Sequence, residues 1–185
     1  MTLHNHNSKK RNTQTLLHTH THTQIINGIN NHWSLISLNI NGLNSPIKRH
    51  RLRDWIWKQD PTFCCLQETH LKHKDRHLLR VKGWEKVFQA NEPKKQAAVA
   101  ILISNKIDFK LKSIRRDGDG HFILLTGTIN QEKVSILNIY TPNIKAPTYV
   151  KEKLLELKAV IKTHTNSRRL QHTSLTNGQV NQTET

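Results

Sequence analysis

Leu35-Ile36-Ser37-Leu38-Asn39-Ile40-Asn41 is the stretch of sequence that decides the fold. Ile36, Leu38 and Ile40 alternate with polar residues, and this period of two predicts a strand with one apolar face. Asn39 is expected on the opposite face, close to the end of the strand.

A helix and a second strand follow. Ser45-Pro46 predicts the start of the helix, because serine caps helices and proline fits their first turn. Asp60-Pro61 predicts its end. Residues 62–66 form a second apolar strand, closed by Gln67-Glu68-Thr69-His70. Strand, helix and strand predict a βαβ unit, and open α/β sheets bind ligands at the carboxyl ends of such strands.

The remaining pattern predicts further strands and one more helix. Strands are expected at residues 84–90, 96–104, 107–111, 121–129 and 133–140. Asp117-Gly118-Asp119-Gly120 predicts a hairpin turn, and Pro147 opens a last helix that should cover the sheet. The successive strands predict an antiparallel meander appended to the parallel unit, so the fold class is α/β with α+β character.

Composition narrows the class of protein. The chain has 185 residues, 29 Lys and Arg against 13 Asp and Glu, and a formal net charge of +16. No apolar run approaches the roughly 18 residues of a membrane span, and the first residues lack a secretory signal. The only cysteines, Cys64 and Cys65, are adjacent, which argues against a disulfide scaffold and a zinc finger. We therefore expect an intracellular protein, nuclear or cytoplasmic and not secreted, with no membrane partner and with an anionic partner such as nucleic acid.

Both ends of the chain differ from the middle. Residues 1–53 and 157–183 contain no Asp or Glu. Residues 1–31, rich in Asn, Thr and His, predict a disordered leader, and residues 164–185 predict an unstructured tail. The alternating run of Thr and His at residues 19–23 is more typical of a simple repeat than of a metal site. The folded domain is expected at residues 32–163.

Four polar residues at predicted strand ends are candidates for chemistry. Glu68 suits a hard cation such as Mg²⁺, which takes one or two carboxylates plus water and phosphate oxygens; it is equally explained as a solvated strand-end acid. Asn39 can position a phosphate beside Glu68 or bond a loop. Tyr140 and Asn143 can donate to phosphate oxygens, although a strand tyrosine more commonly rims the core. The residues alone leave both interpretations open.

Four ordered motifs together are similar to those of one known family. They are Ser37-Leu38-Asn39-Ile40-Asn41-Gly42-Leu43-Asn44, Leu66-Gln67-Glu68-Thr69-His70, Ala98-Val99-Ala100-Ile101-Leu102 and Leu137-Asn138-Ile139-Tyr140-Thr141-Pro142-Asn143. From about Trp33 to Thr163 the chain resembles the endonuclease/exonuclease/phosphatase family. It most resembles the retrotransposon branch, the endonuclease at the start of the second open reading frame of mammalian long interspersed (LINE-type) elements. Residues 44–51 and Lys82-Gly83-Trp84 carry that likeness.

The resemblance implies a four-layer α-β-β-α sandwich that nicks DNA with Mg²⁺ as cofactor. In such enzymes the residue matching Glu68 binds the metal, and the residue matching Asn39 orders the metal and phosphate site. The residues matching Tyr140 and Asn143 hold the scissile phosphate. The expected partner is therefore DNA, contacted through its backbone with weak sequence preference.

The resemblance stops before the family's second half. The later motifs of the family, Gly-Asp-Phe-Asn and Ser-Asp-His, supply a water-activating Asp and a His, and neither has a counterpart after His164. We therefore expect the first half of the sandwich, a truncated domain with impaired catalysis, because activated water and charge stabilisation are needed in one site. The alternatives are an active endonuclease, a non-catalytic basic nucleic-acid-binding protein and a retrotransposon-derived fragment without independent function.

Truncation also predicts an incomplete core. The strands at residues 96–104 and 133–140 are expected on one side of the sandwich, with much of the facing sheet missing. An open sheet face exposes apolar surface. An unstable or molten species without a sharp unfolding transition would follow.

Overall fold

The computed structural model describes residues 22–27, 32–91, 98–140 and 146–164. The strands are β1 (His22–Asn27), β2 (His32–Asn39), β3 (Phe63–Gln67), β4 (Lys86–Asn91), β5 (Ala98–Ile103), β6 (Lys110–Arg116), β7 (Phe122–Ile129) and β8 (Glu132–Ile139). The helices are α1 (Pro46–Gln59) and α2 (Ala146–His164), with a short 3₁₀ helix η1 (His73–Leu79) between β3 and β4. Within these residues neither α-helix is both long and apolar enough to cross a membrane.

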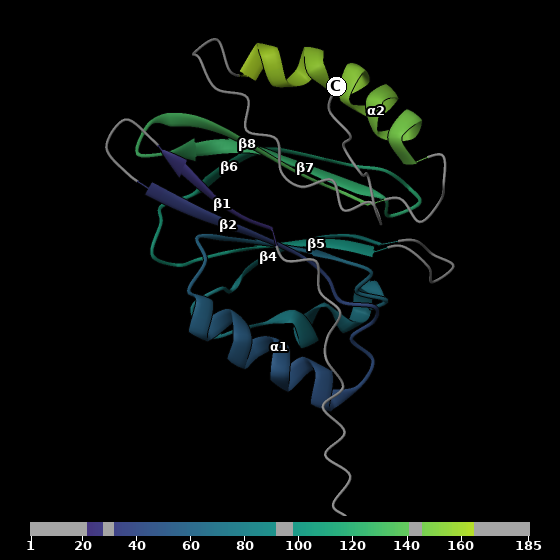
Figure 1. Cartoon of the computed structure of the whole chain (residues 1–185). Helices are drawn as coiled ribbons and strands as arrows, with labels where there is room; N and C mark the ends of the chain where they lie inside the picture. Colours follow the sequence, from purple (N-terminus) through teal and green to yellow (C-terminus); the bar gives the residue numbers. More distant parts are fainter. Residues whose placement is uncertain (1–21, 28–31, 92–97, 141–145, 165–185) are drawn as a thin grey trace, which may run out of the picture.

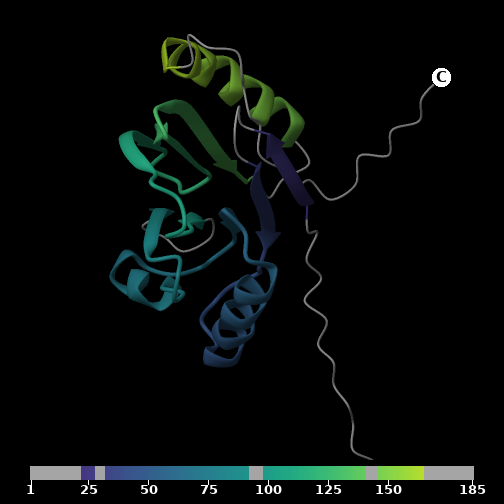
Figure 2. The ribbon, with the colours of Figure 1, turned by 90° about the vertical axis from the view of Figure 1, so that its left-hand side faces the viewer.

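The elements stack in four layers. A five-stranded sheet has the order β1-β2-β3-β5-β4, and a three-stranded sheet has the order β6-β7-β8. Helix α1 covers the outer face of the first sheet and α2 the outer face of the second, so the two sheets face each other in the middle (Figure 1, Figure 2). The predicted mixed α/β sandwich, with its α-β-β-α order of layers, is confirmed.

Three apolar layers lie between the four layers of helices and sheets, because the side chains of each strand alternate between its two faces. In β2, Leu35 faces the opposite sheet, whereas Ile36 packs toward α1. In β7, Leu125 faces the opposite sheet, whereas Leu124 packs toward α2. Successive side chains of a strand point to opposite faces. Each sheet therefore shares one apolar layer with its own helix and one with the other sheet.

The adjacent cysteines show the same alternation. Cys64 packs toward α1 and Cys65 toward the second sheet, and both are fully buried free thiols. Burial raises the pKa of Cys64 well above its usual value and raises the pKa of Cys65 to about 12. Thiols of this kind are packing residues and not nucleophiles.

The predicted βαβ unit is confirmed. Strands β2 and β3 pair in parallel, with Asn39 opposite Gln67. Helix α1 begins at Pro46 and ends before Asp60, which takes the left-handed conformation with φ of 47°. Ile56 on its inner face is fully buried. Parallel pairing brings the carboxyl ends of β2 and β3 to one edge of the sheet.

The predicted meander is wrong in one respect, because its strands divide between two sheets. Strands β4 and β5 extend the first sheet, where β5 pairs antiparallel with β3, whereas β6, β7 and β8 form the second. Strand β5 is apolar on both faces and so needs a central position, whereas β6 is exposed along most of its length and stays at an edge. The strand expected at residues 107–111 begins only at Lys110.

The expectation that residues 96–104 and 133–140 lie on one side is also wrong. They form β5 and β8, which belong to opposite sheets. Ile101 and Ile103 of β5 share the layer between the sheets with Val134 and Ile136 of β8. The described residues therefore supply strands on both sides of this core, which favours cooperative unfolding over the molten species expected from the sequence.

The predicted disordered leader at residues 1–31 is wrong for residues 22–27. They form β1, which pairs antiparallel with β2, from His22 opposite Ser37 to Asn27 opposite His32. Backbone groups at a free sheet edge can pair with almost any sequence, so polar composition did not reveal this strand. The rest of the leader, and the predicted tail beyond His164, lie outside the described residues.

Leu125→Ala should lower the free energy of unfolding by about 2–5 kcal/mol, because it removes a fully buried side chain from between the two sheets. The matched control is Leu155→Ala on α2, where the side chain is 60% exposed and the expected change is below about 0.5 kcal/mol. Urea unfolding followed by circular dichroism measures both. Equal effects of the two variants, or a broad transition of the parent, would contradict a packed inter-sheet core.

Candidate active site

Three polar side chains converge where β2, β3 and β8 end. Asn39 closes β2, Glu68 follows β3, and Tyr140 follows β8 of the other sheet. Asn39 donates from Nδ2 to Glu68 Oε1 at 2.9 Å, and the Tyr140 hydroxyl donates to the same carboxylate oxygen. The structure thus brings together three of the four residues named from the sequence. The fourth, Asn143, lies outside the described residues.

Backbone pairing beyond the strand ends holds Glu68 in place. Gly42 N donates to Glu68 O at 2.7 Å, and Leu43 N donates to Thr69 O at 2.9 Å. Glu68 itself has a φ of 53°, in the left-handed region, which costs a non-glycine residue roughly 1–3 kcal/mol. Conformations of this kind persist only where the surrounding structure fixes them, as it does at functional sites.

Gly42 lets the two loops approach each other. Its φ is 83°, and a Cβ added there would lie 2.9 Å from His70 Nδ1. Glycine is therefore required twice at this position, for its backbone conformation and for the space that His70 fills.

A buried amide network lies directly beneath the site. Asn138 of β8 is fully buried, and its Nδ2 donates to two carbonyls of the facing sheet, Leu66 O at 3.0 Å and Ala100 O at 2.9 Å. Gln67 Nε2 donates to Asn138 Oδ1 and to Ser37 Oγ, both at 2.8 Å. The network ties β2, β3 and β5 of one sheet to β8 of the other.

Reasoning from the sequence missed this network. Its only local signal is that Ser37, Gln67 and Asn138 are polar residues close to the carboxyl ends of otherwise apolar strands. Asn138 belongs to a motif that carries the family resemblance, but no spacing of residues says that its amide reaches the opposite sheet.

The electrostatics of the site keep the Tyr140 hydroxyl protonated, as a hydrogen-bond donor. Burial raises the pKa of its phenol, and the hydrogen bond to Glu68 and the charge of that carboxylate raise it further. A phenol whose charged form is disfavoured in these ways stays protonated near neutral pH. Tyr140 can therefore donate a hydrogen bond to an oxygen anion, but it cannot serve as a base.

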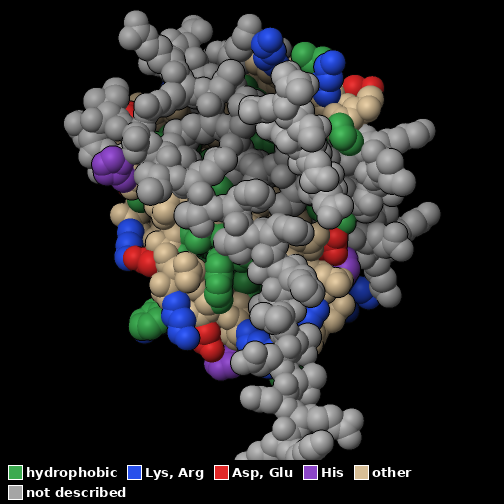
Figure 3. Space-filling model, in the orientation of Figure 1, with side chains coloured by type: hydrophobic (Ala, Val, Ile, Leu, Met, Phe, Trp, Pro, Cys, Tyr) green, Lys and Arg blue, Asp and Glu red, His purple; other side chains and the backbone are tan. Residues whose placement is uncertain are grey.

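Basic side chains border the site on the side of α1. Lys48 Nζ donates to Asn41 O at 2.8 Å, and Arg49 donates to Leu43 O at 2.8 Å and Asn44 O at 2.7 Å. These bonds fix two positive charges beside the loop that follows β2. Figure 3 shows further Lys and Arg side chains on the lower part of one face, interspersed with acidic and His side chains. The two fixed charges of Lys48 and Arg49 favour an anionic group on this side of the site.

A second group of potential metal ligands lies at the same end of the second sheet. Asp117, Asp119 and His121 each place one ligand atom within 4.8 Å of the others, so they could hold a metal ion. Tyr140 N donates to His121 O at 2.8 Å, which puts this group next to the site. Asp117 already accepts from Phe122 N at 3.0 Å and pairs with His121 at 3.3 Å. The sequence predicted the hairpin here correctly. The Asp-x-Asp-x-His spacing of residues 117–121 is the local signal that could also have indicated this group of ligands.

Residues 36–173 match the model of the Endonuclease/Exonuclease/phosphatase family. The chain belongs to this family. The family generally uses a divalent metal ion, and the matched range includes Asn39, Glu68 and Tyr140, the residues that meet at the carboxyl ends of the strands.

Solved structures with a similar fold support the family assignment at the level of architecture. TDP2 from C. elegans matches at 19% sequence identity with a TM-score of 0.54, covering 73% of this chain and 45% of that one. A D. rerio TDP2 humanized by 14 mutations matches at 13% identity with a TM-score of 0.51, covering 69% of this chain and 56% of that one. Likeness at these identities shows the fold alone. The chain spans about half the length of these structures.

Asn138→Leu should lower the free energy of unfolding by roughly 3 kcal/mol, because it removes several buried hydrogen bonds and leaves groups on the facing sheet without this partner. Ser135→Ala on the same strand is the matched control. The buried Ser135 hydroxyl has no hydrogen-bond partner among the described residues, so its loss should be neutral or slightly stabilising. Denaturant unfolding measures both variants; similar effects would contradict the role of Asn138 as the link between the sheets.

Native protein should show no tyrosinate absorbance step near pH 10, the ordinary phenol value. Both tyrosines of the chain have a raised pKa, and burial together with Asp117 raises the pKa of Tyr149 to about 12. Because the phenol pKa values are higher in the folded than in the unfolded protein, their contribution to the free energy of unfolding is complete below about pH 10. It is lost as the pH rises through the pKa values of the folded protein. Spectrophotometric titration of native and urea-unfolded protein tests this. One tyrosine ionising near pH 10 in the native state would contradict it.

Proposed function

We propose that this chain is the amino-terminal half of a Mg²⁺-dependent DNA endonuclease domain of the LINE-type retrotransposon branch. The observation that carries the proposal is the convergence of Asn39 and Tyr140 on one carboxylate oxygen of Glu68. Membership of the family supports a phosphoester-cleaving chemistry. The motif likeness of residues 44–51 and of Lys82-Gly83-Trp84 supports the retrotransposon branch.

The donor set at Glu68 fits Mg²⁺. Glu68 Oε1 accepts two hydrogen bonds, whereas Oε2 bonds to none of the described residues and remains available to a cation. Asn39 Oδ1 accepts from Asn41 N at 3.1 Å and keeps a second lone pair. Mg²⁺ prefers oxygen ligands and is often held by one or two carboxylates together with water and phosphate oxygens. Glu68 and Asn39 would hold the ion, which when bound neutralises charge on the phosphate oxygens.

The remaining groups of the site would bind the scissile phosphate. Tyr140 stays protonated, and its single hydroxyl hydrogen, which is donated to Glu68 in this structure, would turn to a phosphate oxygen once the cation binds that carboxylate. Asn143 is proposed as a second donor. The charges of Lys48 and Arg49 would attract the DNA backbone without reading its sequence. DNA is therefore the proposed partner, with weak sequence preference.

Catalysis by residues 1–185 alone is proposed to be impaired. Glu68 acts as a metal ligand and Tyr140 as a donor, so neither is free to activate water. Glu184 is the sole acidic residue after Glu156, and the water-activating motif of the family has no counterpart in this sequence. Absence of a general base typically lowers the rate by about 10²–10⁴-fold.

A second candidate function is non-catalytic nucleic-acid binding, which the net charge of +16 favours. Either function would be exerted inside the cell, in the nucleus or the cytoplasm, where nucleic acid is present and the thiols of Cys64 and Cys65 stay reduced.

Protein comprising residues 1–185 should nick supercoiled plasmid at no more than the background rate with Mg²⁺ present, yet it should bind the ion at Glu68. Backbone amide signals around Glu68 should shift in an NMR titration with Mg²⁺, and Glu68→Gln should abolish these shifts because it removes the anionic ligand. Glu152→Gln, an exposed acid of the same type on α2, is the matched control and should leave them unchanged.

Two results would contradict this account in different ways. Nicking that both EDTA and Glu68→Gln abolish would overturn the proposal of impaired catalysis and establish an active endonuclease. Shifts that survive Glu68→Gln, or that centre on Asp117, would overturn the assignment of the metal to Glu68. DNA binding that falls steeply with salt in every variant, without Mg²⁺ shifts, would favour the non-catalytic candidate.

A further inference from the structure

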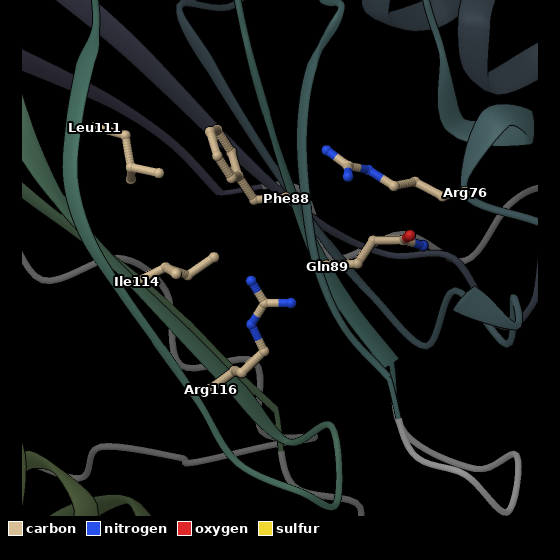
Figure 4. Close-up of a pocket in the computed structure, with 6 residues that line it drawn as sticks. All are labelled: Arg76, Phe88, Gln89, Leu111, Ile114 and Arg116. Carbon is tan, nitrogen blue, oxygen red and sulfur yellow. The ribbon is translucent and has the colours of Figure 1, made fainter. Parts of the chain in front are cut away.

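A hollow of about 220 Å³ lies between the edge strand β4 of the first sheet and the edge strand β6 of the second. Figure 4 shows its six lining residues: Arg76, Phe88, Gln89, Leu111, Ile114 and Arg116. Arg76 comes from η1, so three elements from different parts of the chain build the hollow. Its volume is below the roughly 300 Å³ at which sites for drug-sized ligands begin, so a larger ligand would place only part of itself inside the hollow and the rest along the open strand edge.

Gln89 is the polar group that marks this hollow as a binding site. It is only 5% exposed, and neither its amide nitrogen nor its amide oxygen has a hydrogen-bond partner among the described residues. Buried amides are almost always paired, and an unpaired one calls for a partner such as a ligand. One free donor and one free acceptor lie side by side on this amide.

The two sides of β4 differ in chemical character. Figure 4 shows Gln89 and Arg76 on one side of the strand, and Phe88 with Leu111 and Ile114 on the other. Leu111 is 42% exposed, which leaves the apolar side open to solvent. A ligand lying across the strand edge would meet a polar end and an apolar, partly aromatic end.

Two guanidinium groups give the hollow a positive charge. Arg76 donates to Val87 O on β4, which holds its head group at the strand edge. Arg116 approaches from β6 and forms no ion pair with the described residues. Neither charge is neutralised by a carboxylate in this part of the chain, so an anionic group would be attracted.

We propose that this hollow is a binding site for a single nucleotide. The phosphate lies with the exposed Arg76 at the strand edge, next to the buried Gln89 amide. The base lies against Phe88 and Leu111 with the Arg116 guanidinium beside it, an arrangement that stacking and cation–π attraction favour. The site is separate from the one at Glu68. Gln89 lies on β4 and Glu68 follows β3, and β5 lies between these two strands in the sheet. The proposal does not depend on DNA cleavage.

The nucleotide can come from two sources, a free mononucleotide or an unpaired nucleotide of a DNA strand. NMR titrations of the full chain with dAMP, with inorganic phosphate and with a short single-stranded oligodeoxyadenylate distinguish them. We expect saturable shifts of the Gln89 side-chain amide with dAMP, with the oligonucleotide, or with both, and at least about tenfold weaker binding of inorganic phosphate.

Variants on one strand separate local binding from overall charge. Arg116→Gln should weaken nucleotide binding about tenfold, since it removes a charge at the hollow. Arg115→Gln, the matched control, removes the same charge from the neighbouring residue, which does not line the hollow, and should change binding less than about twofold. Gln89→Leu should also weaken binding and leave the melting temperature equal or higher, because it removes an unpaired buried amide.

The proposal is overturned by any of three results. The Gln89 side-chain amide shows no saturable shift with either nucleotide ligand; inorganic phosphate binds as tightly as dAMP, so that the base contributes nothing; or Arg115→Gln and Arg116→Gln weaken binding equally, so that only net charge matters. Nicking activity enters none of these outcomes, so failure of the proposed endonuclease function would leave them unchanged.

Discussion

The two hydrogen bonds from the buried Asn138 amide to Leu66 O and Ala100 O are the contact on which the site depends. Apolar packing between two sheets is non-directional and tolerates small displacements of one sheet over the other. Hydrogen bonds require a narrow range of lengths and angles, so these two bonds define one position of the second sheet relative to the first. Tyr140 follows Asn138 by two residues on the same face of the strand, and this position puts its hydroxyl on Glu68.

The layer between the sheets changes from apolar to polar toward the carboxyl ends of β2 and β8. Leu35 and Ile136 are apolar and buried deep in the layer, and Ser37 and Asn138, two residues further along each strand, belong to the amide network. Burying such groups is unfavourable unless they are paired, and the network pairs most of their donors and acceptors. Asn39 and Tyr140 come two residues later again, so the side chains of the candidate site lie directly next to this hydrogen-bonded network.

Much of this could be predicted from local pattern. Alternation in residues 35–41, the helix signals at Ser45-Pro46 and Asp60-Pro61 and the hairpin at residues 117–120 all correspond to observed elements. The meeting of Asn39 and Glu68 also follows, because parallel neighbours end at the same edge. Tyr140 is different, because β8 belongs to the second sheet and no local pattern gives the position of that sheet. The family resemblance of its motif was the only feature of the sequence that connected Tyr140 with Glu68.

The sequence by itself determined most of the strands and helices, though not β1, and which of their side chains face inward, because both follow from periods of two and 3.6 residues in the chain. Only the tertiary structure decided what each inward face meets. It placed β5 and β8 in opposite sheets, added β1 to the edge of β2, joined Asn138 to the carbonyls of the facing sheet and left the Gln89 amide unpaired beside a hollow. The physical reason is that periodicity records burial, whereas partners between distant segments are chosen by backbone hydrogen bonds and shape, which leave no mark on the local pattern.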